Sequence, residues 1–153
     1  MTSVELLLMD DSEQADFVAM LGDYLRELDA YELPWDPAPA PEDYARAFED
    51  DPGGQRIEWM VAGGERAGFL ISRVVPDWPE EHRSVGEVIE CYVAPAFRRR
   101  GVGRAAVEAW LARQRADGVD LVEASVLSLN TPALAFWERM GFEVRAVQTL
   151  RRP

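Results

Sequence analysis

The sequence predicts one α/β domain built on a mixed β-sheet that carries helices on both faces. Segments with strand-like and helix-like apolar patterns follow one another in the order β-α-α-β-β-β-α-β-α-β. The chain has 153 residues, which is enough to bury one hydrophobic core. Residues 1–153 show no internal repeat and no linker, so we expect a single domain over this range.

The first third of the chain is predicted to form a strand and two helices. Ser3–Met9 is apolar enough for a strand, and Asp11 with Gln14 forms a capping-box pattern that starts a helix to about Ala30. Apolar side chains recur at helical spacing in that helix: Phe17, Val18, Leu21, Tyr24, Leu25 and Leu28. Four prolines in residues 33–41 exclude a helix there, and a short helix Glu42–Glu49 follows.

The rest of the chain is predicted to add five strands and two helices. Gly63-Gly64 is a hairpin signal between the first two of these strands, and residues 76–86 read as a polar loop. In chain order the elements are strand Ile57–Ala62, strand Ala67–Val75, strand Glu87–Val93, helix Gly101–Ala116, strand Leu121–Leu127, a helix from Thr131 that closes at Gly141, and strand Phe142–Leu150.

The charge of the chain is strongly negative and unevenly distributed. The formal net charge of −12 argues against nucleic acid as a partner. Residues 1–84 contain 20 carboxylates and six arginines, whereas residues 85–153 contain eight carboxylates and ten arginines. A solubility role is one explanation. The other is a pair of ligands of opposite charge, with an anion near the second half and a cation near the first.

Composition also limits the location and the metal chemistry. No stretch approaches the roughly 18–20 apolar residues of a membrane span, and MTSVELLLMDDSEQ lacks the features of a secretory leader. Cys91 is the sole cysteine and His82 the sole histidine, so an internal disulfide and a metal site are not expected. We therefore predict a cytoplasmic protein without a membrane partner or a metal.

The segment AFRRRGVGRAAVEAWL connects a strand to a helix through an arginine-rich turn. Amides in the first turn of a helix have no internal partner, and together with the helix dipole they favour a phosphate. Arginines at this end are unfavourable against the dipole unless an anion is bound. The sequence therefore predicts an anion site here.

Two motifs resemble the GNAT acetyltransferase superfamily. VAPAFRRRGVG at residues 93–103 is similar to its signature V-x-P followed by R/Q-x-x-G-x-G/A. NTPALAFWERMGF at residues 130–142 is similar to its N-x-x-A-x-x-F-Y-E-x-x-G-F motif. The resemblance implies a mixed, mostly antiparallel sheet with a splay between the fourth and fifth strands. A dinucleotide fingerprint, G-x-G-x-x-A from Gly101 with Glu123 beyond, is the weaker alternative because too little chain follows it for a doubly wound sheet.

The resemblance implies acetyl-CoA as co-substrate and an amine as acceptor. The backbone at the splay would bind the pantetheine arm, the arginine-rich turn would bind the pyrophosphate, and the second motif would form the opposite wall. The implied residues are Cys91, Tyr92 and Val93 for the arm; Arg98, Arg99, Arg100, Gly101, Val102, Gly103 and Arg104 for the pyrophosphate; and Asn130, Ala133, Phe136 and Trp137 for the wall. Core packing is the simpler interpretation of Phe136.

The resemblance also implies direct attack of a neutral amine on the thioester, with the N–H of Val93 binding the oxyanion. Glu87 is the first candidate base, and Glu90 is a second that would face the other side of an unbroken strand. Glu123 on the next strand is a third. Trp137 departs from the family's tyrosine and cannot supply a proton. A thiol with a pKa of ~8.5 can leave without one.

The acceptor is expected to be cationic, because the implied acceptor region between the first two helices is rich in carboxylates and aromatic rings. Its members are Glu27, Asp29, Tyr31, Glu32, Trp35, Asp36, Glu42 and Asp43. A peptide or a small molecule could supply the amine, and a homodimer is compatible with this interpretation. Two other hypotheses stay open: a non-catalytic acetyl-CoA-binding domain and a protein-interaction module that uses the proline-rich loop.

Overall fold

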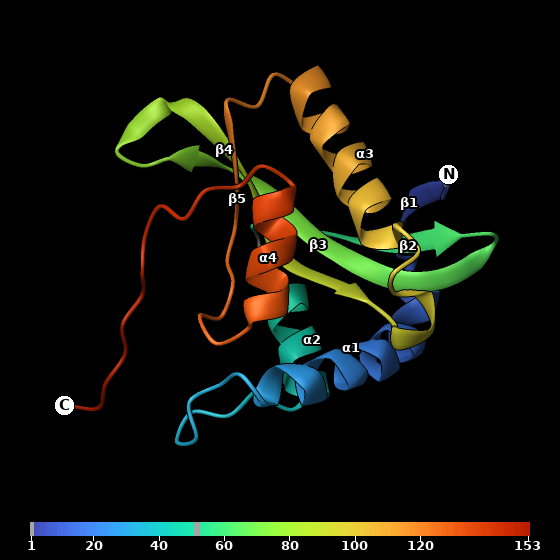
Figure 1. Cartoon of the computed structure of the whole chain (residues 1–153), viewed down its shortest axis with the longest axis horizontal. Coiled ribbons are helices and arrows are strands. Elements are labelled where there is room, and N and C mark those ends of the chain that lie inside the picture. The colour runs from blue at the N-terminus through green and yellow to red at the C-terminus, as the bar shows by residue number, and fades with distance from the viewer. Residues whose placement is uncertain (1, 51–52) are drawn as a thin grey trace.

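The computed structural model describes residues 2–50 and 53–153 (Figure 1). Its strands form one sheet in the order β1-β2-β3-β4-β5. The strands are β1 (Val4–Leu8), β2 (Arg56–Ala62), β3 (Glu65–Asp77), β4 (Glu80–Val93) and β5 (Leu121–Ala124). The helices are α1 (Gln14–Asp29), α2 (Pro41–Asp50), α3 (Val102–Ala116) and α4 (Thr131–Arg139), with short 3-10 turns at η1 (Asp11–Glu13) and η2 (Pro95–Phe97).

The sheet is mixed and mostly antiparallel, as expected. The pairs β1–β2, β2–β3 and β3–β4 are antiparallel, and β4–β5 is parallel, with α3 as the crossover connection. The β4–β5 pairing runs from Val85 opposite Leu121 to Val88 opposite Ala124, whereas β4 continues to Val93. The two strands are therefore paired at one end only, where the splay was expected.

Helices cover both faces of the sheet (Figure 1), and each face has its own core. Under α3 and α4, Trp110 and Val107 pack on Met60 and Leu70. Under α1 and α2, the core cluster contains Phe17, Leu21 and Ala45 from the helices and Trp59, Phe69 and Ile71 from the strands. These two cores fix the α1–α2 layer and the α3–α4 layer on opposite sides of β4.

The start of α1 differs from the prediction by one residue. The amide of Ser12 donates to Asp10 Oδ1 and the amide of Asp10 donates to Glu13 Oε1, each at 3.0 Å. The capping box is thus Asp10 with Glu13, not Asp11 with Gln14, and it closes the short turn η1 ahead of the helix. A carboxylate at the third position satisfies the N-cap amide, which explains the choice.

The prediction of a loop at residues 76–86 is wrong, because most of this segment forms strand. β3 extends to Asp77 and β4 begins at Glu80, with Val75 opposite Val85 and Pro76 opposite Ser84. Backbone pairing between two strands does not require apolar side chains where both are solvated. Arg83 Nε also donates to Asp77 Oδ2 at 2.7 Å across the hairpin.

The prediction of a last strand at Phe142–Leu150 is also wrong. The strand before it, β5, ends at Ala124 and not at Leu127. Residues 142–153 form no strand and run away from the sheet toward the C-terminus (Figure 1). The apolar side chains do not alternate strictly, since Val144 and Val147 are three residues apart, and one face cannot bury both. Near the end of the chain, Arg152 Nη2 donates to the carbonyl oxygen of Trp35 at 3.1 Å.

Candidate active site

The turn before α3 presents free amides at the end of a strand. Gly101 and Arg99 both adopt positive φ, at 77° and 61°, so the chain enters the helix abruptly. The amide of Ala105 donates to Gly101 O at 2.9 Å. The amides of the preceding first turn therefore point out of the helix end without an acceptor in that turn. A Cβ added to Gly103 would lie 3.4 Å from Val93 Cγ2, so this helix end sits directly against the end of β4.

The arginines of this turn have different environments. Arg99 and Arg100 are exposed at the helix end. Arg104 Nε donates to Glu108 Oε1 at 2.8 Å along the outer side of α3. Arg98 instead extends toward α1, where its Nη2 donates to Glu27 Oε2 at 2.7 Å. The backbone amides of this turn, with the exposed Arg99 and Arg100 beside them, are therefore the candidates for the predicted anion site.

The end of β4 has one edge turned away from β3. The amide of Ala94 donates to Ala67 O at 2.8 Å, and Val93 lies opposite Gly68. In an antiparallel ladder, hydrogen-bonded pairs alternate with pairs whose N–H groups point outward. The N–H groups of Val93 and Cys91 therefore point away from β3, beyond the last residue of β4 that pairs with β5.

A β-bulge in β4 determines which face its glutamates occupy. Ile71 of β3 lies opposite Glu90 and Ser72 lies opposite Val88, so Ile89 is an extra residue. Strict alternation would put Glu87 and Glu90 on opposite faces. With the bulge, both face α1 and α2, because the extra residue shifts the alternation by one position.

Glu90 is held by two phenols from two helices. The hydroxyl of Tyr24 on α1 donates to Glu90 Oε2, and that of Tyr44 on α2 donates to Glu90 Oε1. Burial raises the pKa of Glu90, although the two hydroxyls oppose the shift. Burial and the charge of Glu90 raise the pKa of both tyrosines. Helical spacing marked Tyr24 only as a core residue, and no sequence pattern pointed to Tyr44.

Glu87 lies in a row of charged side chains across three strands. Arg73 Nε on β3 donates to Glu87 Oε2, and Glu123 on β5 lies opposite Glu87. Burial raises the pKa of Glu123, and so do a hydrogen bond with Glu87 and the charge of Glu87, while Arg145 lowers it. The structure thus brings together the first and third candidate bases.

The α4 residues have clear structural contacts. Asn130 Oδ1 accepts the amide of Ala133 at 3.2 Å and caps the helix. Trp137 is buried, with its ring centroid 5.1 Å from that of Phe136 and 4.9 Å from that of Phe142, both edge-on. Phe136 also lies against Gly103. α4 therefore packs against the end of α3, on the side of the sheet where the wall was expected.

Cys91 packs on the α3–α4 side of β4. Burial raises the pKa of its thiol to about 12, with a smaller contribution from Glu90. The side chain is therefore a neutral thiol in the core, and its backbone amide is the group that faces the open edge.

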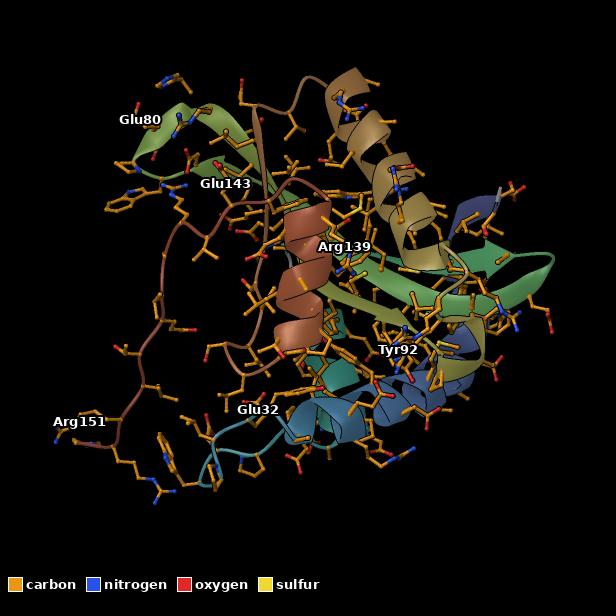
Figure 2. All side chains as sticks on the ribbon, viewed as in Figure 1. Glu32, Glu80, Tyr92, Arg139, Glu143 and Arg151 are labelled. Atoms are coloured by element: carbon orange, nitrogen blue, oxygen red, sulfur yellow. The ribbon has the colours of Figure 1, made fainter. Side chains whose placement is uncertain are left out.

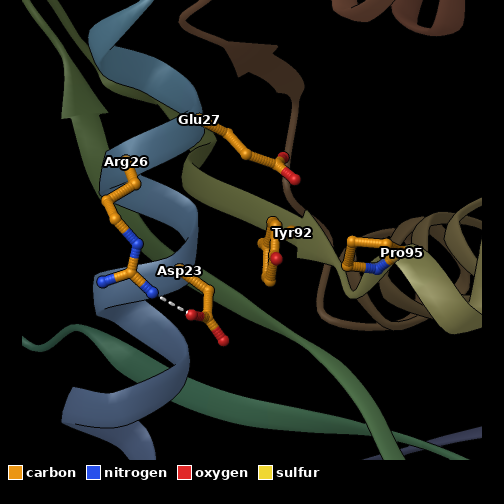
Figure 3. Close-up of a pocket in the computed structure, with 5 residues that line it drawn as sticks. All are labelled: Asp23, Arg26, Glu27, Tyr92 and Pro95. Atoms are coloured by element: carbon orange, nitrogen blue, oxygen red, sulfur yellow. Dashed lines mark hydrogen bonds and ion pairs between the residues drawn. The ribbon is translucent and has the colours of Figure 1, made fainter.

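A pocket of about 360 Å³ lies between α1 and the end of β4 (Figure 3). Its lining residues are Asp23, Arg26, Glu27, Tyr92 and Pro95. Of the expected acceptor residues only Glu27 lines it. Asp23 and Arg26 were missed, although their spacing on one helix face was a usable signal.

Other expected acceptor residues lie beyond α1. Glu32 lies in the segment that follows α1, whereas Tyr92 lies beside α1 itself (Figure 2). The pKa of Glu32 is raised by burial and by the charges of Asp36 and Asp29.

No helix of the described ranges 2–50 and 53–153 has both the length and the apolarity of a bilayer span. The same ranges contain no group of three or more His, Cys, Asp or Glu side chains placed to bind a metal.

Comparison with known proteins gives matches of two kinds. The sequence profile of the Acetyltransferase (GNAT) family matches residues 23–142. A mycothiol acetyltransferase of Thermobispora bispora is 32% identical over 123 residues, which is 73% of this chain and 41% of the relative. Another, of Propionibacterium freudenreichii subsp. shermanii, is 32% identical over 112 residues, 68% of this chain and 35% of the relative. The chain thus spans about two fifths or less of these relatives.

Solved structures support the fold. A ribosomal-protein-alanine N-acetyltransferase from Brucella melitensis biovar Abortus superposes with a TM-score of 0.76 at 17% identity, over 98% of this chain and 99% of that one. A transcriptional regulator from Bacillus halodurans gives a TM-score of 0.73 at 21% identity, over 99% of both chains. At these identities the likeness concerns the fold alone.

Proposed function

The chain belongs to the GNAT acetyltransferase family, and from that premise we propose that it transfers the acetyl group of acetyl-CoA to a primary amine in a ternary complex. One observation carries the proposal. The free amides at the start of α3 lie directly against the end of β4, where the N–H groups of Cys91 and Val93 point to the unpaired edge. One molecule of acetyl-CoA could therefore place its pyrophosphate at the amides of α3 and its thioester at the amides of β4.

Acetyl-CoA fits this part of the chain on three counts. The first-turn amides and the exposed Arg99 and Arg100 suit the pyrophosphate. Gly103 lets the backbone approach closely, because its missing Cβ leaves the junction with Val93 open. The outward amides of β4 suit the amide-rich pantetheine arm and the thioester oxygen. Calorimetric titration with CoA tests this part, and absence of heat would contradict it.

In the proposed reaction the amine nitrogen attacks the thioester carbonyl carbon. A C–N bond forms, the C–S bond breaks, and the thiolate leaves with the bonding pair. The oxyanion is stabilised by an outward amide of β4, either the N–H of Val93 or that of Cys91. Trp137 supplies no proton, and the thiolate leaves as such because a thiol has a pKa of ~8.5.

We propose that Glu87 is the general base, which accepts the proton that the amine loses. Its side chain is 21% exposed, so water and an acceptor can reach it. It is also in contact with Glu123, whose pKa is raised by burial and by the neighbouring Glu87. Glu90 is less suited, because both of its oxygens already accept a phenol hydroxyl, whereas Arg73 Nε donates to Oε2 of Glu87. About three strand residues at ~3.3 Å, or ~10 Å in all, separate Glu87 from Cys91 once the bulge is discounted, so we propose that a chain of waters carries the proton between them.

Two isosteric variants form a matched test of this assignment. Glu87→Gln should lower kcat with an amine acceptor about 10²-fold or more, while acetyl-CoA binding is retained. Glu90→Gln should alter KM for the acceptor more than kcat, because it disturbs the two phenols from α1 and α2. Equal losses of kcat in both variants would contradict the assignment of Glu87.

The acceptor is proposed to be a small cationic amine. The face of the sheet that carries the carboxylates of Glu87, Glu90 and Glu123 also meets the pocket beside α1, and these three favour a positive ligand. Within the pocket, Asp23 and Glu27 are each paired with an arginine. A panel of amines in which only neutral or acidic amines react would refute the cationic acceptor.

A non-catalytic acetyl-CoA-binding role is the second candidate, favoured by the buried Trp137 at the family's tyrosine position. Turnover with any amine decides against it.

A further inference from the structure

Arg98 connects three elements that meet at the end of β4. Its Nε donates to Val93 O and its Nη2 donates to Glu27 Oε2, both at 2.7 Å. Its guanidinium carbon also lies 5.4 Å from the centroid of the Tyr92 ring. The side chain leaves the turn before α3, contacts the backbone of β4 and reaches α1, which lies 71 residues earlier in the chain. No other arginine of the turn makes such contacts in the described part of the chain.

These contacts fix the backbone next to the outward amide of Val93. The peptide that joins Val93 to Ala94 is held at both ends, since its oxygen accepts from Arg98 and its N–H donates to Ala67 O. Glu27 and Tyr92, the other two partners of Arg98, line the pocket between α1 and β4 (Figure 3). One guanidinium thus contacts both the strand end on the acetyl-CoA side and the wall of the pocket on the acceptor side.

We propose that Arg98 is a positioning residue, which clamps α1 onto the end of β4 through Glu27 and so holds the acetyl-CoA site and the acceptor pocket in one geometry. This inference rests on the proposed function. It departs from the sequence-based expectation that Arg98 is a direct pyrophosphate ligand. The exposed Arg99 and Arg100 carry the charge that a pyrophosphate requires.

The two roles predict opposite effects at Glu27. If Arg98 is a clamp, Glu27→Gln loosens the end of β4 and weakens acetyl-CoA binding, although Glu27 itself lies on the acceptor side. If Arg98 is a phosphate ligand, Glu27→Gln removes a competing carboxylate and leaves binding unchanged or tighter. The pair is about two-fifths exposed on each side, so a clamp of this kind should affect binding about three- to fivefold.

The experiment is a double-mutant cycle with Glu27→Gln and Arg98→Gln, read by calorimetric Kd for acetyl-CoA at two salt concentrations. The clamp predicts about three- to fivefold weaker binding in each single variant, no further loss in the double variant, and the same salt dependence of Kd in the two single variants, because salt screens the ion pair that both of them remove. Glu27→Asp should recover part of the loss. Asp16→Asn is the matched control, because Asp16 also lies on α1 and pairs with an arginine, Arg66, but does not line the pocket, and it should leave the Kd unchanged.

Unchanged or tighter binding in Glu27→Gln would overturn the clamp. A salt dependence that falls in Arg98→Gln but not in Glu27→Gln would overturn it too, because that difference marks loss of a direct phosphate contact. A wild-type chain that binds no acetyl-CoA would refute the proposed function instead. In that case the clamp is tested by thermal unfolding. A loss of Tm in the double variant that differs from the sum of the two single losses supports the clamp, and a loss equal to that sum overturns it.

Discussion

The buried ion pair between β2 and α3 allows a quantitative test of the structure. The carboxylate of Glu58 is 1% exposed and accepts two hydrogen bonds of 2.7 Å from Arg113. Arg113→Leu would keep much of the bulk and leave this carboxylate without its main partner. Breaking a buried pair in this way costs about 3–5 kcal/mol. We expect about 3 kcal/mol, because Arg56 Nη2 remains 3.5 Å from Glu58 Oε1.

Urea denaturation followed by circular dichroism measures this loss as a change in the free energy of unfolding. For a domain of this size, about 3 kcal/mol lowers Tm by roughly 6–12 °C. Arg115→Leu is the control, since Arg115 lies exposed on the same helix and should change stability by less than about 0.5 kcal/mol.

A double variant separates the charge from the packing. Glu58→Leu combined with Arg113→Leu removes the buried charge as well, and apolar replacement of a whole pair is often neutral or stabilising. The double variant should therefore be more stable than Arg113→Leu alone. Equal losses in Arg113→Leu and Arg115→Leu would refute the reasoning, because they would mean that Glu58 is solvated without its partner.

Three further predictions concern the site. Gly68→Ala should cost at least about 2 kcal/mol of stability in thermal unfolding, because a Cβ there would lie 1.9 Å from a carbonyl oxygen of β4, whereas Gly22→Ala, with contacts of 3.6 Å or more, should be neutral or stabilising. Trp137→Tyr should preserve or raise turnover, and complete loss of acetyl-CoA binding would show that its side chain does not lie beside the thioester. Glu123→Gln should stabilise the fold above neutral pH, where the raised pKa of Glu123 makes its charged form costly beside Glu87. That gain should vanish below about pH 4, where the carboxyl is protonated in both folded and unfolded chains.

Local patterns in the sequence predicted much of the fold. The Gly63-Gly64 hairpin, the apolar stripe of α1 and the turn before α3 each depend on residues close together in the chain. The order of the elements also predicted the mixed sheet, and the family resemblance added its mostly antiparallel arrangement and the splay between β4 and β5. The prediction for residues 142–150 failed because strand-forming residues need a partner, and the identity of that partner is not encoded locally.

The candidate site was predictable only where backbone supplies the chemistry. The bulge at Ile89 has no residue signature in this strand, and it decides the face of Glu90. The contacts of Tyr24 and Tyr44 with Glu90 span 66 and 46 residues. Such contacts arise from how α1 and α2 pack on the sheet, so no window along the chain contains both partners.

The extra residue in β4 changes how this strand should be read. Before Ile89 the odd-numbered side chains point to the α1–α2 layer, and after it the even-numbered ones do. Two acidic residues three positions apart normally mark one side of a helix, yet here an extended strand produces the same pairing. Deletion of Ile89 would restore a regular pleat and still leave both glutamates on one face, because only Val88 would then separate them. A strand that kept Ile89 but lost the bulge would instead send one of the two glutamates into the apolar layer beneath α3.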